Sequence, residues 1–195
     1  TSLVKIDLPS SVTILDSFAF QDCTGMETIT LSSSLVEIKS YTFSGCKSLI
    51  SVTIPPSIKT IGNNAFIGCS SLKRVEIPSS VISIGNGAFK DCTKLDQVSL
   101  PFKIPAIKES TFSGCSSLSY VYLPSSILSI DKYAFKNCVK LGRVSLPSKL
   151  ASVGDYAFSG CSSLSDIVMA NPITSIGKGA FDGCKNKNWI NIKFS

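Results

Sequence analysis

The sequence predicts an α/β repeat solenoid, a single domain in which similar short units stack one on another. Two observations lead to this prediction: a cysteine recurs every 23 residues along the chain, and a phenylalanine stands three residues before each cysteine. A fixed period over the full length indicates stacked coils with one continuous core. We therefore expect one domain over residues 1–195, made of about eight 23-residue coils. The cysteines are Cys23, Cys46, Cys69, Cys92, Cys115, Cys138, Cys161 and Cys184, and the phenylalanines are Phe20, Phe43, Phe66, Phe89, Phe112, Phe135, Phe158 and Phe181.

Each coil begins with a pattern typical of a short β-strand. With the cysteine as position zero, apolar residues follow at plus six and plus eight, as in Val75 and Ile77. Alternate side chains of a strand point to the same side, so both face the core. A proline such as Pro78 usually follows and ends the strand, because it has no N–H to give to a ladder. We predict nine parallel strands in one continuous sheet, centred on Ile6, Ile29, Val52, Val75, Val98, Val121, Val144, Ile167 and Ile190.

The rest of each coil returns the chain to the start of the next strand. A second apolar pair at plus twelve and plus fifteen, such as Val81 and Ile84, predicts a return wall in which a second short strand can form. The residue just before each cysteine is always Gly, Asn or Asp, the types that tolerate positive φ. We therefore expect a short helical turn that ends in a left-handed cap. The residues at this position are Asp22, Gly45, Gly68, Asp91, Gly114, Asn137, Gly160 and Gly183.

Together these positions form the pattern C-x-x-L-x-x-V-x-[IL]-P-x-x-[IVL]-x-x-I-x-x-x-A-F-x-[GND]. It closely resembles the BspA-type leucine-rich repeats, also called the Treponema pallidum type, over the entire chain. The resemblance implies a right-handed leucine-rich-repeat superhelix with its parallel sheet on the concave face. It also implies adhesion or protein recognition, at the cell surface or outside the cell, and no catalytic centre. The pattern weakens at its end, where Lys187 replaces the leucine and Lys193 the proline.

Composition limits the class of partner. Hydrophobic residues make up 44% of the chain, which is ample for a core, and the net charge of +6 comes from scattered Lys and Arg without a basic run. Such a surface is not typical of nucleic-acid binding. No apolar stretch reaches the roughly 20 residues that span a membrane, so we expect no membrane insertion. The chain opens at Thr1 in mid-repeat, without an initiator Met or a signal peptide, so we expect a fragment of a longer protein.

The cysteines allow three interpretations. Structural zinc needs four converging ligands, usually from closely spaced pairs, and a uniform spacing of 23 without any histidine argues against it. Disulfides between neighbouring coils are possible by distance, since equivalent positions lie about 5 Å apart in a stacked sheet. They would pair the coils two by two, however, and break the equivalence of the repeats. We therefore favour free, buried thiols that act as small apolar residues with a weak donor, beside a stacked row of phenylalanines.

The residue inventory excludes the common catalytic sites. The chain has no histidine, so it contains neither a Ser-His-Asp triad nor a Cys-His pair. Its glycines occupy repeat positions and form neither a P-loop nor a dinucleotide-binding loop. We therefore expect no enzyme activity and no cofactor.

The outward strand positions, plus five and plus seven, are where function is expected. In the first coils they carry small hydroxyl residues, whereas the middle coils carry tyrosine and arginine, the types enriched at binding hot spots. The alternative is a solvated sheet face whose aromatic residues only shield the strands. Phe102 interrupts a serine-rich bend and has two possible placements: exposed at the rim next to Tyr122, or, as is more common, folded over its own coil. The candidate partner-binding residues are Arg74, Gln97, Tyr120, Tyr122, Arg143 and Asp166.

Three functions fit these observations. The first is a recognition module that binds a protein or host-matrix ligand through its concave face. The second is a structural spacer or self-assembling surface rod, either monomeric or associated end to end. The small outward residues of the first coils favour this function. The third is an intracellular scaffold, because reduced cysteines suit a reducing compartment equally well.

Overall fold

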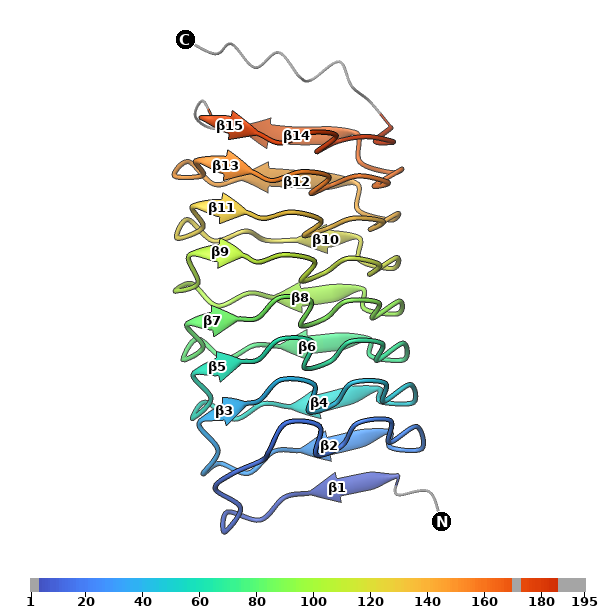
Figure 1. Ribbon diagram of the computed structural model, residues 1–195, viewed down its shortest axis with the longest axis vertical. Coiled ribbons are helices and arrows are strands. Elements are labelled where there is room, and N and C mark those ends of the chain that lie inside the picture. Colours follow the sequence, from blue (N-terminus) through green and yellow to red (C-terminus); the bar gives the residue numbers. More distant parts are fainter. Residues whose placement is uncertain (1–3, 170–172, 186–195) are drawn as a thin grey trace.

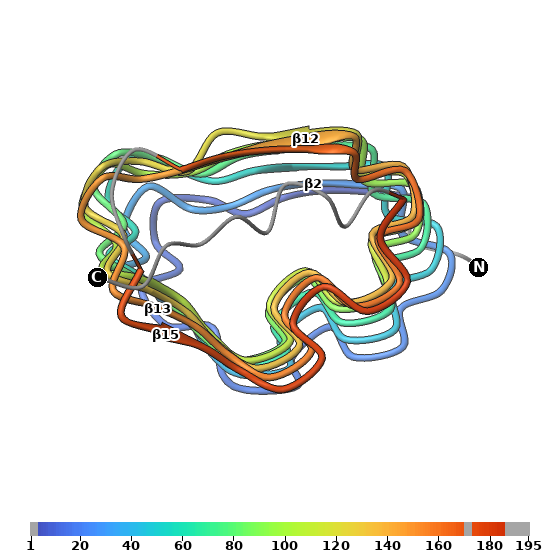
Figure 2. The same ribbon diagram turned by 90° about the horizontal axis from the view of Figure 1, so that it is seen from above.

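The computed structural model describes residues 4–169 and 173–185, which form an elongated stack of coils (Figure 1). Each coil contributes one strand to a long-strand face and, from the second coil on, one two-residue strand to a short-strand face on the opposite side (Figure 2). The strands of the long-strand face are β1 (Lys5–Asp7), β2 (Thr28–Thr30), β4 (Ser51–Thr53), β6 (Arg74–Glu76), β8 (Gln97–Ser99), β10 (Tyr120–Val121), β12 (Arg143–Leu146) and β14 (Asp166–Met169). Those of the short-strand face are β3 (Glu37–Ile38), β5 (Thr60–Ile61), β7 (Ser83–Ile84), β9 (Ala106–Ile107), β11 (Ser129–Ile130), β13 (Ser152–Val153) and β15 (Ser175–Ile176).

The long strands pair in parallel, and each residue lies beside its equivalent 23 positions away, as Val75 lies beside Val98. Within β6 the predicted alternation holds: Val75 is buried, and Arg74 and Glu76 are exposed. The prediction of one continuous sheet was wrong, because the hydrogen-bonded ladder divides into β1-β2-β4 and β6-β8-β10-β12-β14. At the division, the Lys73 N–H still donates to the Ile50 carbonyl at 3.3 Å, so the two sheets remain adjacent. The ninth predicted strand, at Ile190, lies outside the described residues.

The short-strand face is also divided, between β7 and β9, and here the sequence explains why. Along this face the N–H at plus thirteen donates to the same position of the preceding coil, as from Ile82 to the Lys59 carbonyl at 2.9 Å and from Leu128 to the Pro105 carbonyl at 2.8 Å. The equivalent donor in the coil between them is Pro105, which has no N–H. The missing donor therefore falls where the ladder is interrupted.

The predicted α/β class and its helical turns are wrong, because the described residues contain strands but no helix, and the segment before each cysteine consists of turns. The left-handed conformation expected before each cysteine is confirmed, although it caps no helix: φ there ranges from 55° at Asp22 to 76° at Gly114. A second row with positive φ, which the sequence did not predict, lies five residues before the cysteine, with φ of 59° at both Tyr41 and Tyr133. Two left-handed residues so close together interrupt any helix. Their neighbours bond between coils instead, as from the Phe43 N–H to the Ala65 carbonyl at 2.8 Å.

The core contains the two predicted rows of phenylalanine and cysteine. Successive phenylalanine rings stack at centroid distances of 5.1 to 5.6 Å. All eight cysteines are reduced thiols, and all except the half-buried Cys23 are buried. Each buried thiol donates to the carbonyl of the phenylalanine 26 residues earlier, as Cys115 does to Phe89 at 3.1 Å. Burial raises the pKa of the Cys92, Cys115 and Cys138 thiols well above the ordinary range.

Viewed along the stack axis, the long strands of all coils lie on one side of the stack, and the first coils around β2 are displaced from the later ones around β12 (Figure 2). The outward side chains of these strands differ from coil to coil.

Candidate functional site

The outward rows of the long-strand face change character along the stack. In β2 and β4 all four outward residues are small: Thr28, Thr30, Ser51 and Thr53. From β6 onward large, charged or aromatic residues join this face, with Ser99 and Ser145 as the small exceptions, while the inward residues stay apolar. The core is therefore constant and the outward surface is not.

Parallel register brings five of the six predicted site residues into one row across five adjacent strands. Arg74 pairs with Gln97, Gln97 with Tyr120, Tyr120 with Arg143, and Arg143 with Asp166. The sixth, Tyr122, stands two residues after Tyr120, so it projects to the same side. Tyr120, in β10, is 56% exposed, and Tyr122, just after that strand, is 54% exposed.

Two polar contacts fix the side chains on either side of Tyr120. Arg74 donates from Nη2 to Oε1 of Gln97 at 2.7 Å, and Arg143 Nε lies 3.1 Å from Oδ2 of Asp166. Both contacts are exposed to solvent, so they contribute little to folding stability. Each nevertheless holds a planar polar group beside the aromatic rings, with hydrogen-bonding capacity left over for a ligand.

A groove of about 580 Å³ opens among these residues, a volume within the range typical of ligand pockets. It is lined by residues of β6, β8 and β10 and by Phe102, which is 68% exposed. Of the two placements considered for Phe102, the structure has the less common one: the ring is exposed and lines the same groove as Tyr122. The predicted residues Arg143 and Asp166 lie outside the groove lining. The side chains that line it are those of Arg74, Glu76, Gln97, Ser99, Phe102, Tyr120 and Tyr122, with Val75, Ile77, Ser79, Val98, Leu100 and Pro101.

Glu76 and Ser99 are groove residues that the sequence analysis did not select. Both occupy the plus-seven row, as Tyr122 does, so the row itself was the signal that could have identified them. Tyrosine and arginine are the residue types enriched at hot spots, and the carboxylate of Glu76 does not belong to these types.

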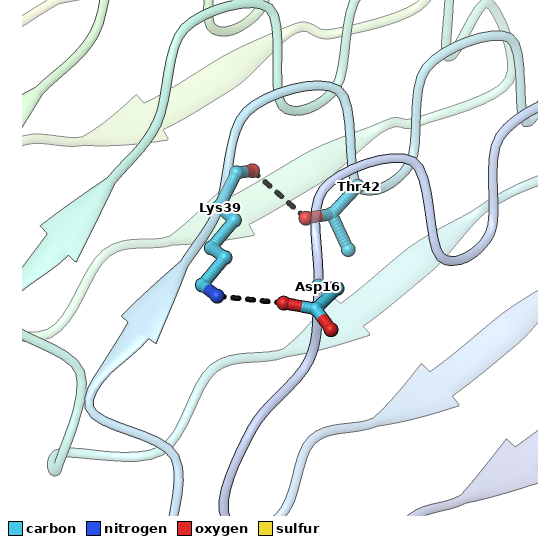
Figure 3. A network of polar contacts seen from close by, with 3 residues as sticks. All are labelled: Asp16, Lys39 and Thr42. Atoms are coloured by element: carbon cyan, nitrogen blue, oxygen red, sulfur yellow. Dashed lines mark hydrogen bonds and ion pairs between the residues drawn. The ribbon is translucent and has the colours of Figure 1, made fainter.

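Polar contacts elsewhere on the turns have structural roles. Lys39 Nζ lies 2.7 Å from Oδ1 of Asp16 in the preceding coil, and Thr42 donates to the Lys39 carbonyl at 2.8 Å (Figure 3). This hydrogen bond to Asp16 raises the pKa of Lys39. Thr42 is buried where most coils have alanine, so its hydroxyl needs that carbonyl as an acceptor.

The described residues contain no group of metal-binding side chains. Within the same ranges, no helix has the length and apolar character to cross a membrane. The long-strand face offers exposed aromatic rings and hydrogen-bonding side chains, which suit non-covalent binding.

Comparisons with known proteins agree with the repeat pattern. The family model described as the BspA type leucine-rich repeat region, with six copies, matches residues 1–119 and 82–195. A search of curated proteins gave no match. A leucine-rich repeat protein from Eubacterium ventriosum is 28% identical, with a TM-score of 0.81 over 96% of this chain and 60% of its own. One from Bacteroides ovatus is 27% identical, with a TM-score of 0.72 over 93% of this chain and 64% of its own.

The chain therefore spans less than two thirds of the length of either structure. A leucine-rich cell surface protein from Faecalibacterium prausnitzii shares the fold at 21% identity and a TM-score of 0.50, over 86% of this chain and 79% of its own. Since the family model matches across both halves of the chain, and the structure has the parallel strand ladder of the repeat, this chain belongs to the BspA-type leucine-rich-repeat family.

Proposed function

We propose that this chain is a recognition module of a surface protein and binds a protein or host-matrix ligand through its long-strand face. The main support is the exposure of two tyrosines, Tyr120 and Tyr122, in a groove on the long-strand face. Tyrosine provides a large and rigid contact area at little cost in conformational entropy. Two coils that share the same core expose only threonine and serine instead.

Location at the cell surface or outside the cell is part of the proposal. It is supported by the family and by the Faecalibacterium prausnitzii neighbour, which is described as a cell surface protein. The repeat fold is in general a scaffold for binding, in keeping with a role that involves no catalysis.

Binding to an immobilised basement-membrane extract, measured by surface plasmon resonance, tests this function. Tyr120→Ala is expected to weaken binding about thirtyfold, the effect of losing a typical hot-spot residue. Thr30→Ala, on the same face in the first coils, should leave binding unchanged. Thermal unfolding should be similar for both variants, because both side chains project away from the core.

The second candidate is a structural spacer, favoured by the small outward residues Thr28, Thr30, Ser51 and Thr53 of β2 and β4. A rod needs a uniform core and no particular outward surface. Equal binding by wild type, Tyr120→Ala and Thr30→Ala, or binding by none of them, would favour the spacer.

A further inference from the structure

We propose that the segment bound over Tyr120 and Tyr122 is proline-rich, adopts the polyproline II conformation and lies along the axis of the stack. This inference rests on the proposed function and names the chemistry of the ligand. It follows from the lining of the groove, the spacing of the outward row and one carboxylate in that row.

The lining of the groove fits proline. Grooves that bind polyproline II segments are lined by aromatic residues, against which the pyrrolidine rings pack. Here Phe102 and the two tyrosines provide exposed rings, and Pro101 lies beside them. A polyproline II segment has no internal hydrogen bonds, so its carbonyls need donors. The tyrosine hydroxyls, Ser99 and the amide of Gln97 are donors in this groove.

The spacing of the plus-seven row fits the repeat of polyproline II. Neighbouring parallel strands lie about 4.8 Å apart, so two coils span about 9.6 Å. One turn of polyproline II contains three residues and advances about 9.3 Å. Every third ligand residue would therefore meet an equivalent position two coils further on.

The outward residues alternate with this two-coil period. Large side chains occur at Glu76, Tyr122 and Val168, each two coils from the next, and Ser99 and Ser145 stand between them. Val168 is 40% exposed, so the row offers a second apolar contact beyond Tyr122. A P-x-x-P segment can thus place one proline at Tyr122 and the other at Val168, because its prolines are three residues apart.

Glu76 adds a charge preference. Its carboxylate is exposed at the groove, two coils before Tyr122 in the same row. The ligand residue three positions from the proline at Tyr122, on the side away from Val168, would lie over Glu76. A basic residue at that end of the segment is therefore favoured by charge complementarity.

The test measures peptide binding by fluorescence anisotropy. The labelled peptides are dodecaproline alone, dodecaproline with one arginine at the N-terminus or at the C-terminus, the all-D mirror image, and a Gly-Ser peptide of equal length. We expect the L-peptide to bind and the other two to bind at least tenfold more weakly, because the mirror peptide winds with the opposite hand. Tyr122→Ala should weaken binding of the L-peptide at least tenfold, and Thr30→Ala should leave it within twofold. Glu76→Gln should abolish the preference for the arginine-tagged peptide over dodecaproline alone.

The outcomes separate this proposal from the proposed function. Equal binding of the L- and D-peptides, or no effect of Tyr122→Ala, would overturn the polyproline inference. The polyproline inference would also be overturned if the matrix extract binds in a Tyr120-dependent manner but unlabelled dodecaproline does not compete. Loss of that binding after periodate treatment of the extract would indicate a glycan ligand instead. If neither peptide nor extract binds, both the inference and the proposed function fail.

Discussion

Strands β2 and β10 present the same inward face and different outward faces. Their buried residues, Ile29 and Val121, are each 2% exposed, so both contribute to one core. Outward, β2 carries Thr28 and Thr30, whereas the chain at β10 carries Tyr120 and Tyr122. The repeat constrains one side of each strand and leaves the other free to vary. Changes to the inward rows are therefore expected to affect folding in every coil, and changes to the outward rows to affect binding in the middle coils.

The largest expected effect is on the cysteine row, through pH. Burial raises the pKa of Cys92, Cys115 and Cys138, so the folded chain keeps thiol protons that the unfolded chain loses above its pKa of about 8.5. Stability contributed by these groups is complete below that pH and falls as pH rises. One pH unit above the unfolded pKa, each thiol lowers the free energy of unfolding by about 1.4 kcal/mol. At pH 9.5 the three thiols together therefore lower it by about 4 kcal/mol.

Urea unfolding measured between pH 7 and pH 10 checks this expectation. Cys115→Ala should be less stable at pH 7 but lose less stability between pH 7 and pH 9.5. Stability that stays constant up to pH 10 would contradict the buried-thiol row. Alkylation of the denatured, unreduced chain should add eight groups by mass spectrometry, whereas disulfides would lower that number.

The next largest effect concerns the phenylalanine row. Phe112 is fully buried between Phe89 and Phe135, so Phe112→Ala is expected to lower the free energy of unfolding by about 3–5 kcal/mol. Phe20 is half-buried, so Phe20→Ala is the matched control and should lower the free energy of unfolding by clearly less. A loss below about 1 kcal/mol at Phe112 would show that the stacked rings are not what holds the coils together.

A smaller effect distinguishes two glycines in the left-handed row. Gly68 and Gly114 have φ of 72° and 76°, so alanine at either costs about 1 kcal/mol of backbone strain. Added side-chain atoms at Gly68 would meet nothing nearer than 3.9 Å, whereas at Gly114 they would overlap Oδ1 of Asp91 in the preceding coil. Gly114→Ala should therefore cost about 1 kcal/mol more than Gly68→Ala, because Asp91 must leave its rotamer.

Chemical denaturation of Gly68→Ala, Gly114→Ala and the double variant Asp91→Gly/Gly114→Ala measures this difference. Without the Asp91 side chain, Gly114→Ala should lower the free energy of unfolding by about as much as Gly68→Ala does. Equal costs for the two single variants would mean that the aspartate turns away freely.

Sequence reasoning succeeded where a residue type has one dominant structural meaning. Alternation around Val75 predicts a strand, and Gly, Asn or Asp before each cysteine predicts positive φ; both are confirmed. It failed where an unexpected residue type adopts the special conformation. Tyr41 and Tyr133 have positive φ although aromatic side chains disfavour it, so the turns were mistaken for helical ones.

The candidate site was predictable in its register and not in its shape. A period of 23 aligns Arg74, Gln97 and Tyr120 without any coordinates. The groove also depends on how Phe102 leaves its bend and on a carboxylate at Glu76, and neither the direction of a loop side chain nor a hollow between rows follows from periodicity. The interruption of the short-strand ladder could have been predicted, since Pro105 lacks the donor that Ile82 supplies in the preceding coil.

The smallest expected effect on folding is at Arg143, and it compares the two sides of a single strand. The ion pair of Arg143 with Asp166 is exposed, so Arg143→Gln should change the free energy of unfolding by no more than about 0.5 kcal/mol. Its neighbour Val144 is fully buried, and Val144→Ala should cost at least about 1 kcal/mol. In the matrix-binding assay the order should reverse, because Arg143 flanks Tyr120 in the outward row and Val144 lies beneath it. If Val144→Ala weakened binding more than Arg143→Gln at a temperature where both variants are folded, the separation of folding from recognition across the strand would not hold.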